Sequence, residues 1–384
     1  MSSSFLRFFI PCSIAAWWLL AFQGQSINYI PSHYESQKNS SIKQSLVSSI
    51  DREKLHQALQ GDMELIYHLM VLWDAEAGLL QKQGLNVERL EPEDLIQASH
   101  CIENIRENSE IKKGRFLPQT VNAASLLLTL LDPEQIVALP EYVRTQSHLY
   151  PQHERVPLTI YSGSVNEEHI YRNKPDLAFV ASYSLPSTVS ALEKQGIDLC
   201  FLDQTDSIAG IQENILRVGE LCAVPQKAHL LSLFIQSAMA ALDNRLILAK
   251  QEAYSNPKRP LYLSYYTRYY TPSKNILQGE LLKRAKLDSL LASSLHEHER
   301  KIPLSKEEIH HLAPDYLYLS TPQDNSIAHS FFNDPTFQEI PAVRNGQVHL
   351  IDESVQESPN HFVVLAYYDL LSPLIEYKAA NHGS

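Results

Sequence analysis

The fold is decided by residues 157–221, which read PLTIYSGSVNEEHIYRNKPDLAFVASYSLPSTVSALEKQGIDLCFLDQTDSIAGIQENILRVGEL. Short strands are predicted at Leu158–Tyr161, Leu177–Ala181 and Ile197–Asp203, and a helix follows each, the last over Ser207–Leu221. The apolar run Leu177–Ala181 is typical of a strand buried on both faces. This alternation predicts right-handed βαβ units, in which ligands bind at the carboxyl ends of the parallel strands.

A similar unit recurs in the second half of the chain. Ile170 and Ile309 each stand shortly before a proline-aspartate pair, and an apolar strand ending in serine follows both pairs. Between the two units, Gln226–Ala253 carries one apolar stripe at helical spacing and ends before Asn256 and Pro257. At 1.5 Å per residue this helix would be about 40 Å long, enough to cross between two lobes. We therefore expect an α/β protein with two Rossmann-like lobes, each with a parallel sheet, bridged by one long helix.

The rest of the chain divides by composition. Residues 51–113 repeat leucine and isoleucine at helical spacing and carry no strand signal, so we expect a helical extension packed on the first lobe. We predict six segments: a signal peptide (1–26), a flexible tether (27–50), the helical extension (51–113), an N-terminal α/β lobe (114–225), the connecting helix (226–256) and a C-terminal α/β lobe (257–380).

The N-terminus predicts export. Met1–Ser26 has one charged side chain, Arg7, then an apolar stretch over Phe8–Phe22, then Gln23–Ser26. This is the layout of a cleavable signal peptide, and it places the protein in a periplasm-like compartment. An uncleaved anchor helix is the alternative, since the apolar stretch approaches membrane-spanning length.

Composition excludes several classes of protein. The net charge of −12 supplies no basic footprint for nucleic acid, and 44% hydrophobic residues describe a globular protein. The chain has no phosphate-binding loop, G-x-S-x-G or H-E-x-x-H motif, so we nominate no catalytic residue and do not expect an enzyme. Besides Cys101, the strand residue Cys200 and the helix-end residue Cys222 could form a disulfide or remain free thiols.

An ordered set of features supports a family resemblance. The strand–helix opening of the first lobe, the proline-aspartate-strand-serine unit, the helix start Asp206–Ile211, the long crossing helix and the turn Val343–Val348 occur in that order. Together they resemble the substrate-binding proteins of ABC importers for iron-siderophore, haem and cobalamin. The resemblance covers about Arg115–Tyr377 and implies a monomer that holds a small-molecule ligand between two lobes and delivers it to an inner-membrane permease. It implies no resident cofactor, and the extension over Asp51–Lys113 is not part of the ordinary family pattern.

Tyrosines are the main candidate ligand-binding residues. Several cluster where the first strand of the second lobe ends, and aromatic rings with hydroxyl groups suit a large flat or macrocyclic ligand. Arg144 and Arg268, from loops of opposite lobes, could bind ligand carboxylates bidentately or be solvated surface residues. Tyr262, inside a strand, is expected to be structural. The predicted ligand-binding residues are Asn122, Tyr142, Arg144, Ser162, Ser182, Tyr183, Tyr265, Tyr266, Arg268, Tyr269 and Tyr270.

Two other functions remain open. A receptor for free Zn or Mn would need about four well-placed ligands, and the run His296–Glu299 resembles a metal cluster but is more typical of a solvated loop. We therefore predict no metal-binding residue. Alternatively, the chain is an envelope interaction protein with a degenerate cleft, whose helical extension is the working part.

Overall fold

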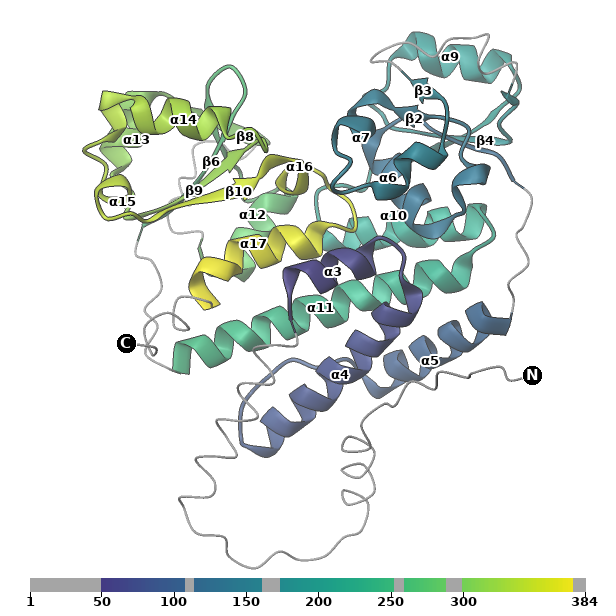
Figure 1. Cartoon of the computed structure of the whole chain (residues 1–384), viewed down its shortest axis with the longest axis horizontal. Helices are drawn as coiled ribbons and strands as arrows, with labels where there is room; N and C mark the ends of the chain where they lie inside the picture. The colour runs from purple at the N-terminus through teal and green to yellow at the C-terminus, as the bar shows by residue number, and fades with distance from the viewer. Residues whose placement is uncertain (1–49, 108–113, 161–172, 252–258, 288–298, 376–384) are drawn as a thin grey trace, which may run out of the picture. The chain divides into compact units, whose positions relative to one another are not determined.

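The computed structural model describes residues 50–107, 114–160, 173–251, 259–287 and 299–375 (Figure 1). The predicted signal peptide and tether, Ser162 and the histidine run His296–His298 lie outside these ranges. Within them, no helix is both long and apolar enough to cross a membrane.

Lobe one is built on parallel strands, as predicted. Its main sheet has the order β1 (Phe116–Pro118), β4 (Leu177–Val180), β5 (Asp198–Phe201). A small parallel pair, β2 (Leu139–Pro140) and β3 (Thr159–Ile160), joins it through a single bridge between Phe116 and Ile136. The helices of this lobe are α6 (Val121–Leu130), η1 (Pro133–Gln135), α7 (Glu141–Thr145), η2 (Pro151–Arg155), α9 (Pro186–Lys194) and α10 (Ile208–Leu221).

Lobe two has a mixed sheet. Strands β6 (Pro260–Tyr265), β9 (Tyr316–Thr321) and β10 (Val348–Asp352) are parallel, while β7 (Tyr269–Pro272) and β8 (Lys301–Leu304) continue the sheet antiparallel to their neighbours. Its helices are α12 (Leu277–Arg284), α13 (Lys306–Leu312), α14 (Ser326–Asn333), η3 (Pro335–Phe337), α15 (Pro341–Arg344), α16 (Glu353–Gln356) and α17 (Val363–Ile375). The prediction of a loop after Tyr266 is therefore wrong, because this segment forms β7, the second strand of a hairpin with β6.

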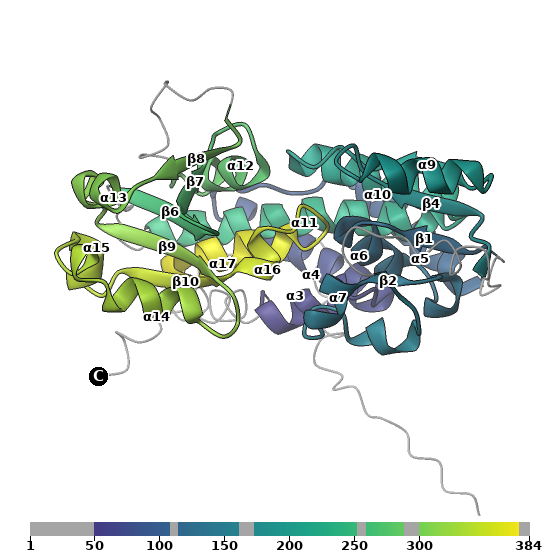
Figure 2. The same ribbon diagram turned by 90° about the horizontal axis from the view of Figure 1, so that it is seen from above.

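One long helix serves both lobes. Helix α11 (Pro225–Gln251) packs against α10 of lobe one and α17 of lobe two. Figure 2 shows it running behind both sheets. Among the described strands no sheet includes segments of both lobes, which confirms the predicted fold class of two α/β lobes bridged by a helix.

The helical extension is not packed on lobe one alone. Its helices are α3 (Arg52–Leu59), α4 (Met63–Lys82) and α5 (Pro92–Glu107); α4 and α5 lie along α11, and α3 contacts α17 (Figure 1). Asn244 of α11 pairs with both backbone groups of Glu88, at 2.8 and 2.7 Å. Arg52 makes a bidentate pair with Asp369 of α17, at 2.6 and 3.0 Å. The expectation that the extension packs on lobe one is wrong, because the apolar stripes of α4 and α5 pack against the connecting helix.

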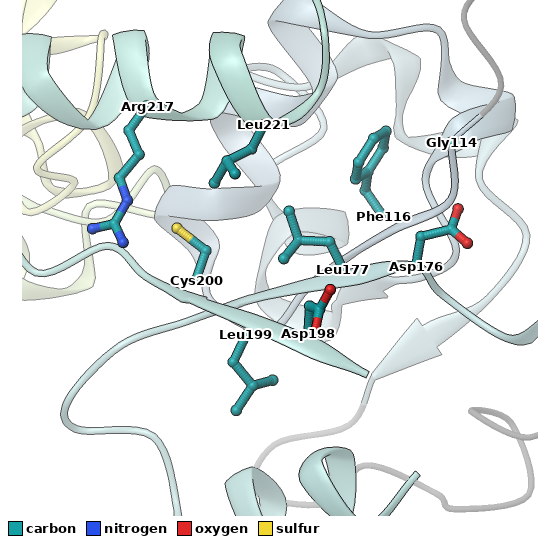
Figure 3. A pocket seen from close by; sticks show the side chains of 9 residues that line it. All are labelled: Gly114, Phe116, Asp176, Leu177, Asp198, Leu199, Cys200, Arg217 and Leu221. Atoms are coloured by element: carbon teal, nitrogen blue, oxygen red, sulfur yellow. The ribbon is translucent and has the colours of Figure 1, made fainter. Parts of the chain in front are cut away.

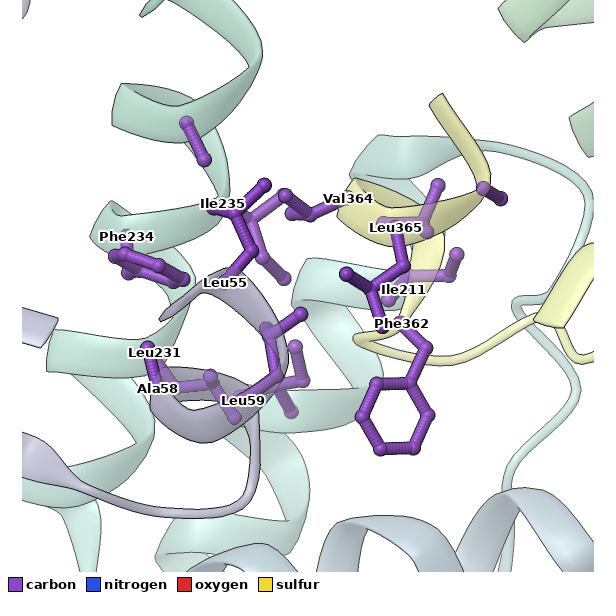
Figure 4. Packing of buried hydrophobic residues seen from close by; sticks show 14 of the residues in the cluster. Leu55, Ala58, Leu59, Ile211, Leu231, Phe234, Ile235, Phe362, Val364 and Leu365 are labelled. Carbon is purple, nitrogen blue, oxygen red and sulfur yellow. The ribbon is translucent and has the colours of Figure 1, made fainter. Parts of the chain in front are cut away.

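The extension and both lobes meet at one backbone carbonyl. The Leu59 oxygen accepts a hydrogen bond from His361 Nε2 of lobe two, at 2.9 Å, and Thr129 Oγ1 of lobe one lies 3.1 Å from this oxygen and also from that of Ser125. Apolar side chains of α3, α11 and the segment around Phe362 surround this point (Figure 4). Burial lowers the pKa of His361 to about 3, so its ring is neutral with the proton on Nε2.

The three cysteines of the described chain are free and buried. Burial raises the pKa of each thiol, that of Cys222 to about 12. Of the two alternatives for Cys200 and Cys222, the structure therefore has the pair of buried thiols.

Candidate functional site

The carboxyl ends of the parallel strands place the candidate site. In open α/β sheets ligands bind beyond these ends, where the loops carry polar side chains. We define the interlobe face by residues of both lobes: Tyr142, Tyr183, Tyr266, Asp352 and Glu353, at or just beyond strand carboxyl ends, and the pair Lys301–Glu357, which contacts Tyr266.

Direct contacts join the two lobes beside this face. His148 Nε2 of lobe one lies 3.1 Å from Oδ2 of Asp352, the last residue of β10 in lobe two. The backbone N–H of Ile208 at the start of α10 donates to Glu280 Oε2 of α12, at 3.0 Å. Side-chain and backbone contacts therefore both cross from one lobe to the other.

Lobe one contributes two exposed tyrosines. Tyr142 follows β2 and is 52% exposed, and Tyr183 follows β4 and is 73% exposed. Partial burial, and after it the carboxylate of Glu353, raises the pKa of Tyr142; Asp352 and Glu357 act in the same direction. All three carboxylates belong to lobe two and lie within electrostatic reach of the Tyr142 hydroxyl.

Lobe two contributes Tyr266, which follows β6 and is 50% exposed. Lys301 Nζ donates to the Tyr266 hydroxyl at 2.8 Å and to Glu357 Oε2 at 2.5 Å. The Tyr262 hydroxyl lies 3.5 Å from the same glutamate. The Tyr262 side chain is buried, which fits the structural role expected of it.

The other predicted tyrosines divide between the two faces of the hairpin. Tyr269 is 6% exposed and packs against Phe331 and Phe337 in the core of lobe two, so assigning it to the ligand was wrong. Side chains alternate along a strand, and β7 turns Tyr269 away from its neighbour. The Tyr265 ring packs against Tyr269 on the same side, with ring centres 4.9 Å apart and the planes tilted by 57°. Tyr270 stays beside Tyr266, with ring centres 6.1 Å apart.

The two predicted arginines are engaged within their own lobes. Arg144 donates to the backbone carbonyls of His153, Val156 and Leu158, at 2.6 to 3.1 Å, so its guanidinium is not available as the predicted carboxylate clamp. Arg268 is exposed and donates to the Tyr270 hydroxyl at 3.1 Å.

The small polar residues of lobe one have mixed positions. Asn122 is buried in the first turn of α6, below the side-chain cap formed by Thr120. Ser182 is exposed, and its backbone N–H donates to Asp203 at 2.7 Å. A ligand contact by Ser182 or Asn122 stays a prediction.

Sequence reasoning missed the charged residues of the interlobe face. Asp352 ends the last predicted strand and Glu353 directly follows it, so the carboxyl-end rule could have found them. Lys301 and Glu357 come together only through the pairing of β8 and the turn after α16, which no local sequence pattern indicates.

A separate pocket of about 500 Å³ opens at the amino ends of the strands in the lobe-one sheet (Figure 3). Asp176, Leu177 and Asp198 line it, and they stand at the amino ends of β4 and β5. The fold therefore does not favour it as the ligand site. Among the described residues, no group of three or more histidine, cysteine, aspartate or glutamate side chains is placed to hold a metal ion.

Comparison with known proteins gives a consistent result. A family model described as periplasmic binding protein matches residues 122–355, which is more than half of the chain. No curated protein sequence matches significantly.

Solved structures resemble the fold at low sequence identity. The periplasmic haem-binding protein RhuT from Roseiflexus has a TM-score of 0.57 at 17% identity, covering 69% of this chain and 99% of that one. A possible iron-binding, periplasmic solute-binding protein from Staphylococcus epidermidis has a TM-score of 0.54 at 18% identity, covering 67% and 98%. The periplasmic haem-binding protein HutB of Vibrio cholerae has a TM-score of 0.55 at 17% identity, covering 68% and 98%.

Proposed function

The chain belongs to the periplasmic binding protein family, and on this basis we propose that it is an exported receptor for an iron chelate, haem or cobalamin-type compound. The ligand binds at the interlobe face and is delivered to an ABC permease of the inner membrane. The carrying observation is the group of three half-exposed to exposed tyrosines, Tyr142, Tyr183 and Tyr266, which come from both lobes at strand carboxyl ends.

Tyrosines suit such a ligand for two reasons. Their rings offer a large rigid contact area to a flat or macrocyclic compound, and the hydroxyl adds a polar contact. A tyrosine oxygen is also one of the protein ligands that can hold haem iron. Structurally similar proteins described as haem-binding or possibly iron-binding support the same class.

Neither alternative function has a comparable observation in its favour. A receptor for free Zn or Mn needs a cluster of metal ligands, and the described residues supply none. An interaction protein acting through the extension would leave those helices available, whereas α4 and α5 pack along α11.

Titration of the purified protein tests the proposal. Hemin, a ferric trihydroxamate and cyanocobalamin are added separately, and binding is followed by fluorescence quenching and by the melting temperature. We expect one of them to bind with micromolar or better affinity, worth about 8 kcal/mol. Tyr142→Ala and Tyr183→Ala should each weaken binding, whereas Phe332→Ala, an exposed ring on α14, should not. Equal losses in all three variants, or no response to any compound, would refute the proposal.

A further inference from the structure

Lys301 makes three contacts with two functional neighbours. Its ammonium donates to Glu357 at 2.5 Å and to the Tyr266 hydroxyl at 2.8 Å, and it lies 4.5 Å from the centre of the same ring. The side chains of Lys301 and Glu357 are 29% and 16% exposed, so the pair is largely withdrawn from water. Tyr266 itself remains 50% exposed.

The ammonium of Lys301 keeps its charge. Burial opposes the charged form of Lys301, but Glu357 and the Tyr266 hydroxyl outweigh this effect, and the pKa of the ammonium is raised. Hydrogen bonds from a charged donor are about twice as strong as neutral ones. A half-buried ion pair is costly to desolvate, and this one has the close geometry and the additional hydroxyl acceptor that such a pair needs.

The contacts fix a side chain that would otherwise be mobile. Tyr266 stands at the tip of the β6–β7 hairpin, where an exposed ring can exchange between rotamers. Lys301 holds its hydroxyl end, and the edge-to-face ring of Tyr270 holds its flank. A ring held in one orientation binds without the loss of rotamer entropy that a free ring incurs.

The Lys301–Glu357 pair lies near Tyr142 of lobe one. Glu357 is one of the three carboxylates that raise the pKa of Tyr142, so the anchor of Tyr266 lies within electrostatic reach of the lobe-one tyrosine. Tyr142 belongs to lobe one and Tyr266 to lobe two.

We propose that Lys301, held by Glu357, is a positioning residue that fixes the ring of Tyr266 for ligand contact at the interlobe face. The inference rests on the proposed function, because it assigns Tyr266 to the ligand. Lys301 acts through Tyr266 and does not itself touch the ligand.

The chain offers a matched control. Lys306 pairs with Asp334 at 2.5 Å, also on lobe two, but at the start of α13 and without contact to Tyr266. Lys306→Met removes the same type of ion pair as Lys301→Met. An effect on binding that is specific to Lys301 therefore cannot come from the loss of a salt bridge as such.

A double-mutant cycle tests the proposal. Affinities for hemin, a ferric trihydroxamate and cyanocobalamin are measured for Lys301→Met, Tyr266→Ala, the double variant and Lys306→Met. We expect Lys301→Met to weaken binding of the bound compound about tenfold, Lys301→Arg to restore most of it, and Lys306→Met to leave it unchanged. In the Tyr266→Ala background, Lys301→Met should cause no further loss. The same tenfold loss in that background, or unchanged binding of Tyr266→Ala, would overturn the inference.

A second measurement separates this inference from the proposed function. Fluorine NMR of protein labelled with 3-fluorotyrosine, with the Tyr266 signal assigned from Tyr266→Phe, reports the ring without any ligand. We expect one sharp signal in the wild type and in Lys306→Met, and a broadened or split signal in Lys301→Met. If no compound binds, the proposed function fails. Independently of that result, an unchanged signal in Lys301→Met would show that Lys301 does not position the ring.

Discussion

The buried histidine where the three parts of the chain meet should make stability depend on pH. His361 has no exposed surface, and burial lowers its pKa from an ordinary value of about 6.5 to about 3. Between these values the unfolded chain binds a proton that the native protein excludes. Stability therefore falls as the pH falls through this window.

The size of the effect follows from the two pKa values. Protonation of the unfolded state alone costs the native protein about 2 kcal/mol between pH 7 and pH 5. His361→Gln removes the titrating group, and the amide of glutamine can still donate to the Leu59 carbonyl that His361 contacts at 2.9 Å. We expect the variant to lose about 2 kcal/mol less than the wild type over this range.

Urea unfolding at pH 7, 6 and 5 measures this difference. The test compares the change with pH rather than the stability at one pH, so a constant cost of repacking the glutamine cancels. His329→Gln, at an exposed position on α14, controls for the loss of a histidine. If wild type and His361→Gln lose the same stability between pH 7 and pH 5, His361 is not held neutral at this junction.

Three further predictions concern residues outside the ligand site. Tyr269→Ala should lower the free energy of unfolding by about 3–5 kcal/mol and leave ligand affinity unchanged, because the ring lies in the lobe-two core; unfolding and titration together check this. Arg52→Gln should lower the free energy of unfolding by about 1 kcal/mol, because its partner Asp369 is largely buried. This loss should exceed that of Arg106→Gln, because both side chains of the Arg106–glutamate pair are exposed. A result in the reverse order would contradict the role of α3 as a link to lobe two. Alkylation of Cys222 by iodoacetamide at pH 8 should be slow in the native protein and fast in urea, because burial raises the pKa of the thiol; rapid native labelling would contradict its burial.

The parallel strands could be predicted because their signals are local. The apolar runs of β4, β5 and β9 are bounded by proline, glycine and aspartate, and β10 spans Val348–Asp352 as expected. The hairpin of β7 and β8 could not, because its polar and proline-containing strands form through pairing with β6 rather than through their own propensity. Because strand β7 was not predicted, Tyr269 was wrongly assigned to the ligand. Only in a strand do the side chains of neighbouring tyrosines point to opposite faces.

The candidate site could be located from the sequence only in part, for a related reason. The carboxyl-end rule points to the segments of Tyr142, Tyr183 and Tyr266, which are exposed there, and their contact with a ligand stays a prediction. It could not show that Arg144 is engaged by three backbone carbonyls, since acceptors of the main chain have no sequence signature. Nor could it pair Lys301 with Glu357, which are distant in the chain and meet only in the folded lobe.

The extension bears on how the lobes can move. The family match begins at residue 122, after the extension, yet the carbonyl of Leu59 accepts from His361 of lobe two and lies 3.1 Å from the Thr129 hydroxyl of lobe one. A change in the angle between the lobes must therefore pivot close to Leu59, or break the buried contact with His361 and leave a polar group without a partner, at about 1–3 kcal/mol. Arg52 adds a bond from the same helix to Asp369. In this chain, α3 consequently favours small rotations about the junction over wide separation of the lobes.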